Sequence, residues 1–456
     1  MNKLLITAAA SGSGKTAVTC ALLAALQKRG KKVCAFKCGP DYIDPMFHRS
    51  VLGVESHNLD LFLSTEEAVR NLFETYSAGK DAMIVEGVMG YYDGLGGLTD
   101  RASAYHVADT LHLPVLLVLR PKGTSLTLAA QVKGLCDFRV PHHIAGILMN
   151  DCSPMLYQSL APMLEKETGL PVFGYLPHME EAAFESRHLG LYTAAEIDDL
   201  AARIEKLAEQ MEKSVDLEKL LYVCQFEENI LENRAEEKRE SYVRLAVAKD
   251  EAFCFLYEET LDILQKAGVE IVYFSPLHDN CLPKNIDGLY LPGGYPELYA
   301  KRLSENEVMR NTIRTAVENG LPTVAECGGF LYLCQTLQDA EGVFHRMAGV
   351  LPVNGVKTEK LVRFGYAELR ANADSMLFRT GETVPIHEFH YWDTTEKGEA
   401  FTMVKPISGR SWQCGFANET LYAGFPHLYF AGNEKLVQRF VAAMEKRRKE
   451  NNHESL

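Results

Sequence analysis

A run of small and polar residues near the start of the chain has the composition of a phosphate-binding loop. Residues 7–16 read Thr-Ala-Ala-Ala-Ser-Gly-Ser-Gly-Lys-Thr, between a short apolar run and a helical pattern. In such a P-loop the backbone N–H groups face the anion, the lysine reaches the outer phosphates, and the hydroxyl suits Mg²⁺. The residues predicted to bind a nucleoside triphosphate are Ser11, Gly12, Ser13, Gly14, Lys15 and Thr16.

One position departs from the P-loop pattern GxxxxGK[ST]. The first glycine of the pattern is Ala9 in this chain. We therefore expect the chain to enter the loop with a negative φ, because alanine avoids the left-handed region. A glycine-rich turn followed by a chance Lys-Thr pair is the alternative interpretation. The strand-like run before the loop and the helical pattern after it favour the P-loop.

Two further predicted strands end in residues that could act on a phosphate or a metal. Residues 32–37 lead into a loop, 37–48, that holds a lysine, two aspartates, a tyrosine and a histidine. Open α/β sheets bind ligands at the carboxyl ends of their strands, which favours a functional role for this loop. Gly-Pro-Asp and Asp-Pro are also ordinary turn formers, and this is the alternative. Residues 81–85 lead into Glu86, which resembles a Walker B acid that holds Mg²⁺ directly or through water.

A cysteine in the second half lies in the sequence context of a nucleophile elbow. The strand-like run 322–326 ends at Cys327, and Gly328 and Gly329 follow and open a helical pattern. A thiol at a helix N-terminus should be exposed and have a lowered pKa, which favours nucleophilic catalysis. The N–H groups of Gly328 and of Gly294, in an upstream Gly-Gly turn, could form an oxyanion hole. A buried structural cysteine is the alternative.

A nucleophilic cysteine needs a base, and two later stretches offer a histidine. His427 follows in a run of aromatic and small residues, and His387 and His390 belong to a strand-like His-Glu-Phe-His. The spacing of the latter pair is not that of the zinc motif HExxH. We predict that His427 is the base and that the stretch 387–390 is structural or lines the substrate site.

The composition excludes two classes of partner. The formal net charge is −14, whereas nucleic acids and anionic membranes are bound by basic surfaces, so neither partner is expected. The 11 cysteines show no CxxC spacing, which argues against a zinc site and a disulfide framework. A reducing compartment fits this pattern, and we predict a cytoplasmic protein.

The order of the predicted elements gives the fold class. A chain of 456 residues is too long for one ordinary core, so two domains are expected. Apolar strands alternating with amphipathic helices predict an α/β fold, with a doubly wound parallel sheet in the first domain. A long polar helix and a charged run interrupt this alternation. We predict a P-loop domain at 1–197, a helical and charged linker at 198–240, and a second α/β domain at 241–456.

The second half resembles a class I glutamine amidotransferase domain of the type fused to cobalamin-pathway amidases. The resemblance rests on Leu-Pro-Gly-Gly-Tyr-Pro-Glu at 291–297, on Ala-Glu-Cys-Gly-Gly-Phe at 325–330 and on the late His427. The first half is similar to the dethiobiotin-synthetase-like ATP-binding domain.

Together the two halves resemble the family of cobyrinic acid a,c-diamide synthases. Three stretches of the first half carry this resemblance: the loop 37–48, residues 86–94, and Arg-His-Leu-Gly-Leu at 187–191. The resemblance implies that Cys327 attacks the side-chain amide of L-glutamine, that His427 moves the proton, and that ammonia is released. ATP with Mg²⁺ would phosphorylate the a and c acetate groups of a corrinoid polycarboxylate, and ammonia would displace the phosphate. A homodimer is a further expectation.

The resemblance also implies roles for individual residues. Asp41 would join Thr16 and Glu86 as a ligand of Mg²⁺. The residues expected to serve the substrate and phosphoryl transfer are Lys37, Tyr42, Ile43, Asp44 and Asp93.

One residue departs from the amidotransferase pattern. Many class I amidotransferases have a glutamate two residues after the histidine, and this chain has Tyr429. The group that orients the histidine is therefore either missing, which leaves a Cys-His dyad, or supplied by another part of the chain.

Other acceptors and another class of protein stay open at this point. Hydrogenobyrinic acid and nickel-sirohydrochlorin also carry acetate side chains. Cobyric acid synthase is less favoured, because its loop after the second strand reads differently. A partition-ATPase-like switch protein would share the P-loop, but it has no need of the elbow at Cys327 or of His427.

Overall fold

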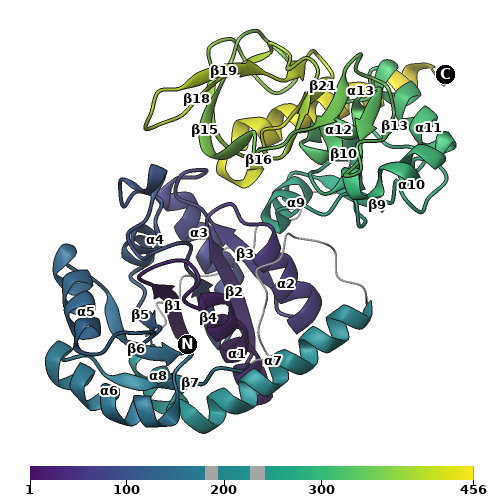
Figure 1. Ribbon diagram of the computed structural model, residues 1–456. Helices are drawn as coiled ribbons and strands as arrows, with labels where there is room; N and C mark the ends of the chain where they lie inside the picture. Colours follow the sequence, from purple (N-terminus) through teal and green to yellow (C-terminus); the bar gives the residue numbers. More distant parts are fainter. Residues whose placement is uncertain (180–193, 226–241, 455–456) are drawn as a thin grey trace. The chain divides into compact units, whose positions relative to one another are not determined.

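The computed structural model describes residues 1–179, 194–225 and 242–454 (Figure 1). The described residues form two compact units, one before residue 226 and one after residue 241. Both units are built from strands and helices, which confirms the predicted α/β class. No helix within the described ranges is long and apolar enough to cross a membrane.

The first unit contains a seven-stranded sheet in the order β3-β2-β4-β1-β5-β6-β7, with every neighbouring pair parallel. Its strands are β1 (Asn2–Ala8), β2 (Val33–Cys38), β3 (Ser56–Leu59), β4 (Ala82–Glu86), β5 (Val115–Leu119), β6 (Ile144–Asn150) and β7 (Val172–Leu176). Its helices are α1 (Lys15–Lys28), α2 (Ile43–Leu52), α3 (Glu66–Ser77), η1 (Leu95–Gly97), α4 (Ala104–Leu111), α5 (Leu126–Phe138), α6 (Pro154–Thr168), α7 (Ala194–Ser214) and α8 (Leu217–Val223).

Helices cover both faces of this sheet (Figure 1). Successive side chains of a strand point to opposite faces, so Leu5 belongs to one apolar core and Leu4 and Ile6 belong to the other. The first core is closed by α3, α4, α5 and α6, and the second by α1, α7 and α8. The strands are apolar on both faces because both faces are buried. The predicted doubly wound parallel sheet is confirmed.

Helix α7 corrects part of the predicted linker. Ile204, Leu207, Ala208 and Met211 recur at helical spacing and are buried against α1, α2 and the sheet. The rest of the helix surface is polar, and this is why the stretch reads as solvated in the sequence. Residues 198–225 therefore belong to the first unit. The remainder of the predicted linker, with the predicted boundary near residue 241, lies outside the described residues.

The second unit contains a six-stranded sheet in the order β20-β21-β11-β10-β8-β9, in which only the β20–β21 pair is antiparallel. Two four-stranded sheets accompany it, β13-β12-β14-β17 and β16-β15-β18-β19. The strands are β8 (Val243–Ala248), β9 (Val269–Phe274), β10 (Gly288–Leu291), β11 (Thr323–Glu326), β12 (Thr336–Gln338), β13 (Phe344–Arg346), β14 (Asn354–Lys357), β15 (Arg363–Ala371), β16 (Thr383–His390), β17 (Trp392–Thr394), β18 (Phe401–Val404), β19 (Ser411–Cys414), β20 (Phe416–Ala417) and β21 (Leu421–Gly424). The helices are α9 (Glu258–Lys266), η3 (Pro296–Tyr299), α10 (Ala300–Glu305), α11 (Glu307–Glu318), α12 (Gly328–Leu333), η4 (Phe430–Gly432) and α13 (Glu434–Glu454).

The six-stranded sheet is also buried on both faces. One face packs against α10, α11 and α12, and this core includes Ala325 and Cys327. The other face packs against α9, α13 and strands β15, β16 and β18, and this core includes Val324, Tyr290 and Leu428. The carboxyl end of β11 lies between β10 and β21, so residues after these three strands meet at one edge.

Replacing an apolar residue of α7 tests whether this helix is part of the first core. Leu207→Ala removes a buried side chain that packs in the core and is expected to lower the free energy of unfolding by about 2–5 kcal/mol. Urea titration of the full chain measures the shift. Glu209→Ala, on the exposed side of the same helix, is the matched control and should change stability by about 0.5 kcal/mol or less. Equal effects of the two changes would place the helix outside the core.

Candidate active sites

The predicted P-loop connects β1 to α1 and depends on a glycine at its end. Gly14 is the N-cap of α1 and has a φ of +93°. A Cβ at this position would lie 2.0 Å from Nδ2 of Asn150 and would displace that amide, and the left-handed φ strains any other residue. Ala9 is not among the residues with positive φ, as expected from its side chain. The loop therefore enters without strain and turns at glycine.

Asn150 at the end of β6 supports this loop from outside its own sequence. Its Nδ2 donates a hydrogen bond of 3.0 Å to the carbonyl oxygen of Ser13. In the structure its amide holds the P-loop backbone.

A buried ionic cluster lies next to the P-loop. Oε1 of Glu86 accepts hydrogen bonds from Oγ1 of Thr16 at 2.6 Å and from Nζ of Lys37 at 2.8 Å. Lys37 also lies 2.5 Å from Oδ2 of Asp44, and Nε2 of His48 lies 3.7 Å from Oε2 of Glu86. These residues come from β4, α1, β2 and α2 and meet at the carboxyl edge of the sheet. The structure thus brings together four predicted residues and adds His48, which the sequence analysis had given no role.

The charges of this cluster are interdependent. Burial opposes the ionised form of Glu86, but Lys37 and His48 outweigh it and hold its pKa below the ordinary value. Burial likewise opposes the charge of Lys37, but Asp44 and Glu86 raise its pKa well above the usual one. Burial raises the pKa of Asp44 to about 8, and Glu86 adds to this while Lys37 opposes it. These directions favour the ionised carboxylate at Glu86 and the protonated one at Asp44. A divalent cation bound at the cluster would favour the ionised form of both.

The oxygen atoms of the cluster suit a hard cation. Oε2 of Glu86 is buried and has no hydrogen-bond partner among the residues that the structure describes. Hydroxyl and carboxylate oxygens are the donors that Mg²⁺ prefers. Thr16, Glu86 and the nearby Asp41 therefore fit the predicted magnesium site.

Lys15 is held at the mouth of the loop by backbone carbonyls. Its Nζ lies 2.5 Å from the carbonyl oxygen of Met89 and 3.3 Å from that of Ala10. Burial lowers its pKa, and the nearby charge of Lys37 acts in the same direction. An anion at the loop would reverse this effect, because it favours the charged ammonium.

The loop after β2 is shaped by Asp41 and by Asn58, a residue that no sequence motif had indicated. Oδ1 of Asp41 accepts hydrogen bonds from the N–H groups of Ile43 at 2.8 Å and Asp44 at 3.2 Å. Asn58 on β3 donates to the carbonyl oxygens of Gly39 at 2.9 Å and of Asp41 at 2.7 Å. Of the other predicted substrate residues, Tyr42 is buried and Ile43 is partly exposed.

Asp93 shapes the glycine-rich loop after β4. Its Oδ2 accepts a hydrogen bond of 2.9 Å from the N–H of Gly90. A Cβ at Gly90 would lie 2.7 Å from the carbonyl oxygen of Ala9, and the N–H of Tyr91 donates to that of Ala8. This loop therefore packs against the entrance of the P-loop.

Cys327 adopts the strained backbone expected of a nucleophile elbow. It lies between β11 and α12 with φ +46° and ψ −99°, a conformation that costs a non-glycine residue about 1–3 kcal/mol. Its N–H donates to the carbonyl oxygen of Gly424 at 2.7 Å, which ties the elbow to β21. A Cβ at Gly329 would lie 2.0 Å from the carbonyl oxygen of Leu291, so close packing requires glycine there.

The environment of the thiol corrects one prediction. Only 7% of Cys327 is exposed, and burial raises its pKa, with Glu297 adding to the effect and the N–H of Gly328 opposing it. The start of the six-residue helix α12 does not overcome the loss of solvation. The predicted exposure and lowered pKa were therefore wrong. A neutral thiol needs a base to remove its proton before it can attack.

The two predicted oxyanion-hole residues lie side by side. A Cβ at Gly328 would lie 2.9 Å from the backbone nitrogen of Gly294. The Gly-Gly turn after β10 and the elbow after β11 thus bring two backbone segments together, because β10 and β11 are neighbouring parallel strands.

His427 follows β21 and sits over the same Gly-Gly turn. Its N–H donates to the carbonyl oxygen of His387 at 2.9 Å. A Cβ at Gly293 would lie 2.5 Å from Cε1 of His427, so the imidazole packs directly on this glycine. The competing histidines have other surroundings: burial lowers the pKa of His387 to about 3, and His390 stacks on Phe425 with ring centroids 3.8 Å apart.

The structure supplies a carboxylate for His427 that the sequence analysis missed. Oε2 of Glu326 lies 3.5 Å from Nδ1 of His427. The hydroxyl of Tyr429, at the position where a glutamate was sought, donates instead to Oε1 of Glu259 at 3.2 Å. Glu326 immediately precedes the nucleophile, and the only signal in the sequence was a carboxylate at the end of an apolar strand.

Comparisons with known proteins match both halves of the chain. Residues 4–191 match the model of the CobQ/CobB/MinD/ParA nucleotide binding domain, and residues 244–435 match that of the CobB/CobQ-like glutamine amidotransferase domain. The cobyrinate a,c-diamide synthase of Caldanaerobacter subterraneus subsp. tengcongensis is 38% identical over 440 residues, which cover 96% of this chain and 97% of that protein. This chain belongs to the cobyrinate a,c-diamide synthase family.

Two further cobyrinate a,c-diamide synthases show the same degree of similarity. The protein of Clostridium acetobutylicum is 38% identical over 447 residues, covering 97% of this chain and 100% of that protein. The protein of Salmonella typhimurium is 38% identical over 447 residues, covering 96% and 97%. Membership of this cobalamin-biosynthesis family makes the chain a carbon–nitrogen ligase with a nucleotide-binding domain and a glutamine amidotransferase domain. The stretch 187–191, which contributed to the predicted resemblance, lies outside the described residues.

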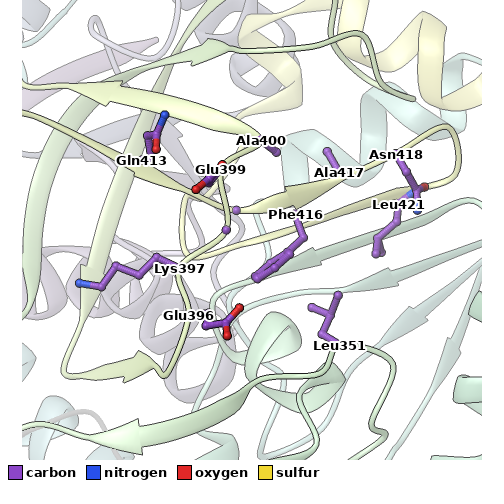
Figure 2. A pocket seen from close by; sticks show the side chains of 12 residues that line it. Leu351, Glu396, Lys397, Glu399, Ala400, Gln413, Phe416, Ala417, Asn418 and Leu421 are labelled. Atoms are coloured by element: carbon purple, nitrogen blue, oxygen red, sulfur yellow. The ribbon is translucent and has the colours of Figure 1, made fainter.

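A surface hollow elsewhere in the amidotransferase domain contains none of the predicted site residues. It has a volume of about 880 Å³ and lies beside β18, β19, β20 and β21. Figure 2 shows the apolar side chains of Phe416 and Leu351 and the charged side chains of Glu396, Lys397 and Glu399 among the residues that line it.

Adding a methyl group under the imidazole tests the placement of His427. Gly293→Ala would put a Cβ 2.5 Å from Cε1 and is expected to displace the ring and lower glutamine-dependent activity about 10²-fold. Activity with ammonium salts should persist. The matched control is Gly134→Ala in α5, where a Cβ meets no atom within 4 Å. Full glutamine-dependent activity of Gly293→Ala would show that the ring position is unimportant.

Proposed function

We propose that this chain amidates the a and c acetate carboxylates of cobyrinic acid, using ATP and L-glutamine. One observation carries the proposal: a P-loop with a buried acidic cluster and a cysteine elbow with a histidine occur in one chain. The relatives that share both halves over nearly their full length are named for this reaction.

The second domain would release ammonia from glutamine. Sγ of Cys327 attacks the side-chain amide carbon, and His427 takes the thiol proton and passes it to the departing ammonia. The N–H groups of Gly294 and Gly328 would stabilise the oxyanion, and each such donor is worth about 10²–10³ in rate. Water then attacks the thioester, which yields glutamate and restores the thiol.

The first domain would activate the acceptor carboxylate. A carboxylate oxygen of the corrinoid attacks the γ-phosphorus of ATP and ADP leaves, which gives an acyl phosphate. Ammonia attacks its carbonyl carbon, inorganic phosphate leaves, and a proton is lost. Two such cycles, on groups a and c, use two molecules of ATP and two of glutamine.

Catalysis of phosphoryl transfer is mainly positioning and charge neutralisation. Residues 11–16 would hold the triphosphate, with Lys15 moving from its backbone carbonyls to the outer phosphates. Thr16, Asp41 and Glu86 would hold Mg²⁺, which supplies positive charge at the phosphate oxygens. The residues proposed to position the acceptor and its phosphate are Lys37, Tyr42, Ile43, Asp44 and Asp93.

Two other acceptors fit the same chemistry, namely hydrogenobyrinic acid and nickel-sirohydrochlorin. The relatives' names favour cobyrinic acid over both. A partition-type switch is disfavoured, because such a protein has no use for a glutaminase site. A homodimer and a cytoplasmic location stay predictions.

The direct test measures ATP hydrolysis by the purified protein with Mg²⁺ and glutamine. Four mixtures are compared: no acceptor, cobyrinic acid, hydrogenobyrinic acid and nickel-sirohydrochlorin. The expected result is turnover with cobyrinic acid and a product whose mass shows two amides. Turnover and amide formation with another acceptor alone would reassign the substrate.

Replacing the nucleophile separates the two reactions. Cys327→Ala is expected to abolish synthesis from glutamine and to keep synthesis from ammonium, because only the second domain uses the thiol. Product mass measures both. Cys281→Ala, which removes an exposed cysteine, should leave both activities intact. Loss of ammonium-dependent synthesis in Cys327→Ala would contradict the division of labour.

Replacing the P-loop lysine should stop synthesis with either nitrogen source. Lys15→Ala removes the cation expected at the outer phosphates, so ATP turnover should fall while glutaminase activity without acceptor remains. Lys28→Ala, an exposed lysine of the same helix, is the control. Retained synthesis in Lys15→Ala would refute the assignment of the P-loop.

A further inference from the structure

We propose that Glu326 is the positioning residue that orients His427 for catalysis. This inference rests on the proposed Cys327–His427 glutaminase and assigns the carboxylate that its histidine lacks at position 429. Oε2 of Glu326 lies 3.5 Å from Nδ1 of His427, and the two side chains are 0% and 3% exposed. The separation is that of an ion pair, longer than an ordinary N–H···O hydrogen bond. Catalytic hydrogen bonds commonly shorten as charge develops.

The carboxylate is fixed on both oxygens. Oε1 of Glu326 accepts a hydrogen bond of 3.0 Å from the N–H of Leu428, the residue after His427. Oε2 accepts one of 3.1 Å from the hydroxyl of Tyr290 on β10. The carboxylate thus binds the backbone that carries the histidine as well as facing its ring. Its position is therefore set by β11, which carries it, by Tyr290 on β10 and by the backbone of Leu428 after β21.

Strand geometry explains why two adjacent residues serve one histidine from different directions. Ala325 and Cys327 belong to the core on one face of the six-stranded sheet. Val324, Tyr290 and Leu428 belong to the core on the other face, where alternation also directs Glu326. One face of the strand end thus presents the thiol, and the other presents the carboxylate.

The burial of the Cys327 thiol makes proton transfer to His427 necessary, and this is the step that Glu326 would assist. Because the buried site of Cys327 disfavours the thiolate, His427 is needed to take the thiol proton. An imidazole can do this at Nε2 only when Nδ1 carries the hydrogen. A carboxylate at Nδ1 selects that tautomer and stabilises the imidazolium that forms. Glu326 is placed to do both.

A purely structural role is the competing explanation, and Glu326→Gln separates the two. The amide oxygen of glutamine can still accept from Leu428, so the backbone contact is retained. Its NH₂ group would face Nδ1, which favours the tautomer with hydrogen on Nε2 and blocks proton acceptance there. Tyr290→Phe removes the other hydrogen bond and leaves the charge in place, so it serves as the matched control.

Steady-state kinetics of the full chain provide the first test. With Glu326→Gln, kcat from glutamine should fall about 10²–10⁴-fold, as expected when a base is held in the wrong tautomer. The KM for glutamine and the ammonium-dependent rate should stay within about threefold of the unchanged protein. Tyr290→Phe should lose less than about tenfold in kcat. An unchanged kcat in Glu326→Gln, or equal loss of both activities, would overturn the proposal.

The tautomer of His427 provides a second test that does not require a variant at 326 to fold. Long-range ¹H–¹⁵N spectra of the histidine-labelled protein, with His427→Asn for assignment, should show hydrogen on Nδ1. Hydrogen on Nε2 with none on Nδ1 would overturn the role of Glu326. Cys327→Ala distinguishes this outcome from failure of the underlying function: if that variant keeps glutamine-dependent synthesis, the glutaminase assignment itself falls.

Discussion

Each domain is organised around a carboxylate that is completely buried at the last residue of a parallel strand. Glu86 ends β4 and Glu326 ends β11, and both are 0% exposed. A buried carboxylate is costly unless cations or hydrogen-bond donors compensate it. The surrounding chain therefore has to supply partners from distant segments. In both domains these partners include groups that the proposed chemistry uses: Thr16 and Lys37 beside Glu86, and His427 beside Glu326.

The two carboxylates are compensated differently, and the difference matches their proposed tasks. Glu86 is surrounded by Lys37, the hydroxyl of Thr16 and His48, and one of its oxygens keeps no hydrogen-bond partner in the described part of the chain. That arrangement suits the binding of a further cation. Both oxygens of Glu326 accept hydrogen bonds, which suits fixing one histidine rather than binding an ion.

Much of the fold and of the two candidate sites could be predicted from the sequence, because local sequence patterns determine those features. The P-loop and the elbow at Cys327 are each contained in a few consecutive residues, and each strand or helix of the alternation shows its own hydrophobic period. The stretch that became α7 was misread, because its apolar stripe is narrow and only contact with α1 shows that it is buried. The state of the Cys327 thiol was misread as well, since solvation depends on atoms from other segments.

The sequence by itself determined which reactive groups the chain carries and the strands or loops on which they stand. Those features follow from hydrophobic period, glycine placement and short-range spacing. Only the tertiary structure decided which of these groups meet. Glu326 contacts a histidine about a hundred residues away, and Asn58 and Asn150 fix loops belonging to other strands. Neighbouring parallel strands are separated in sequence by whole crossover connections, so spacing along the chain does not encode these contacts.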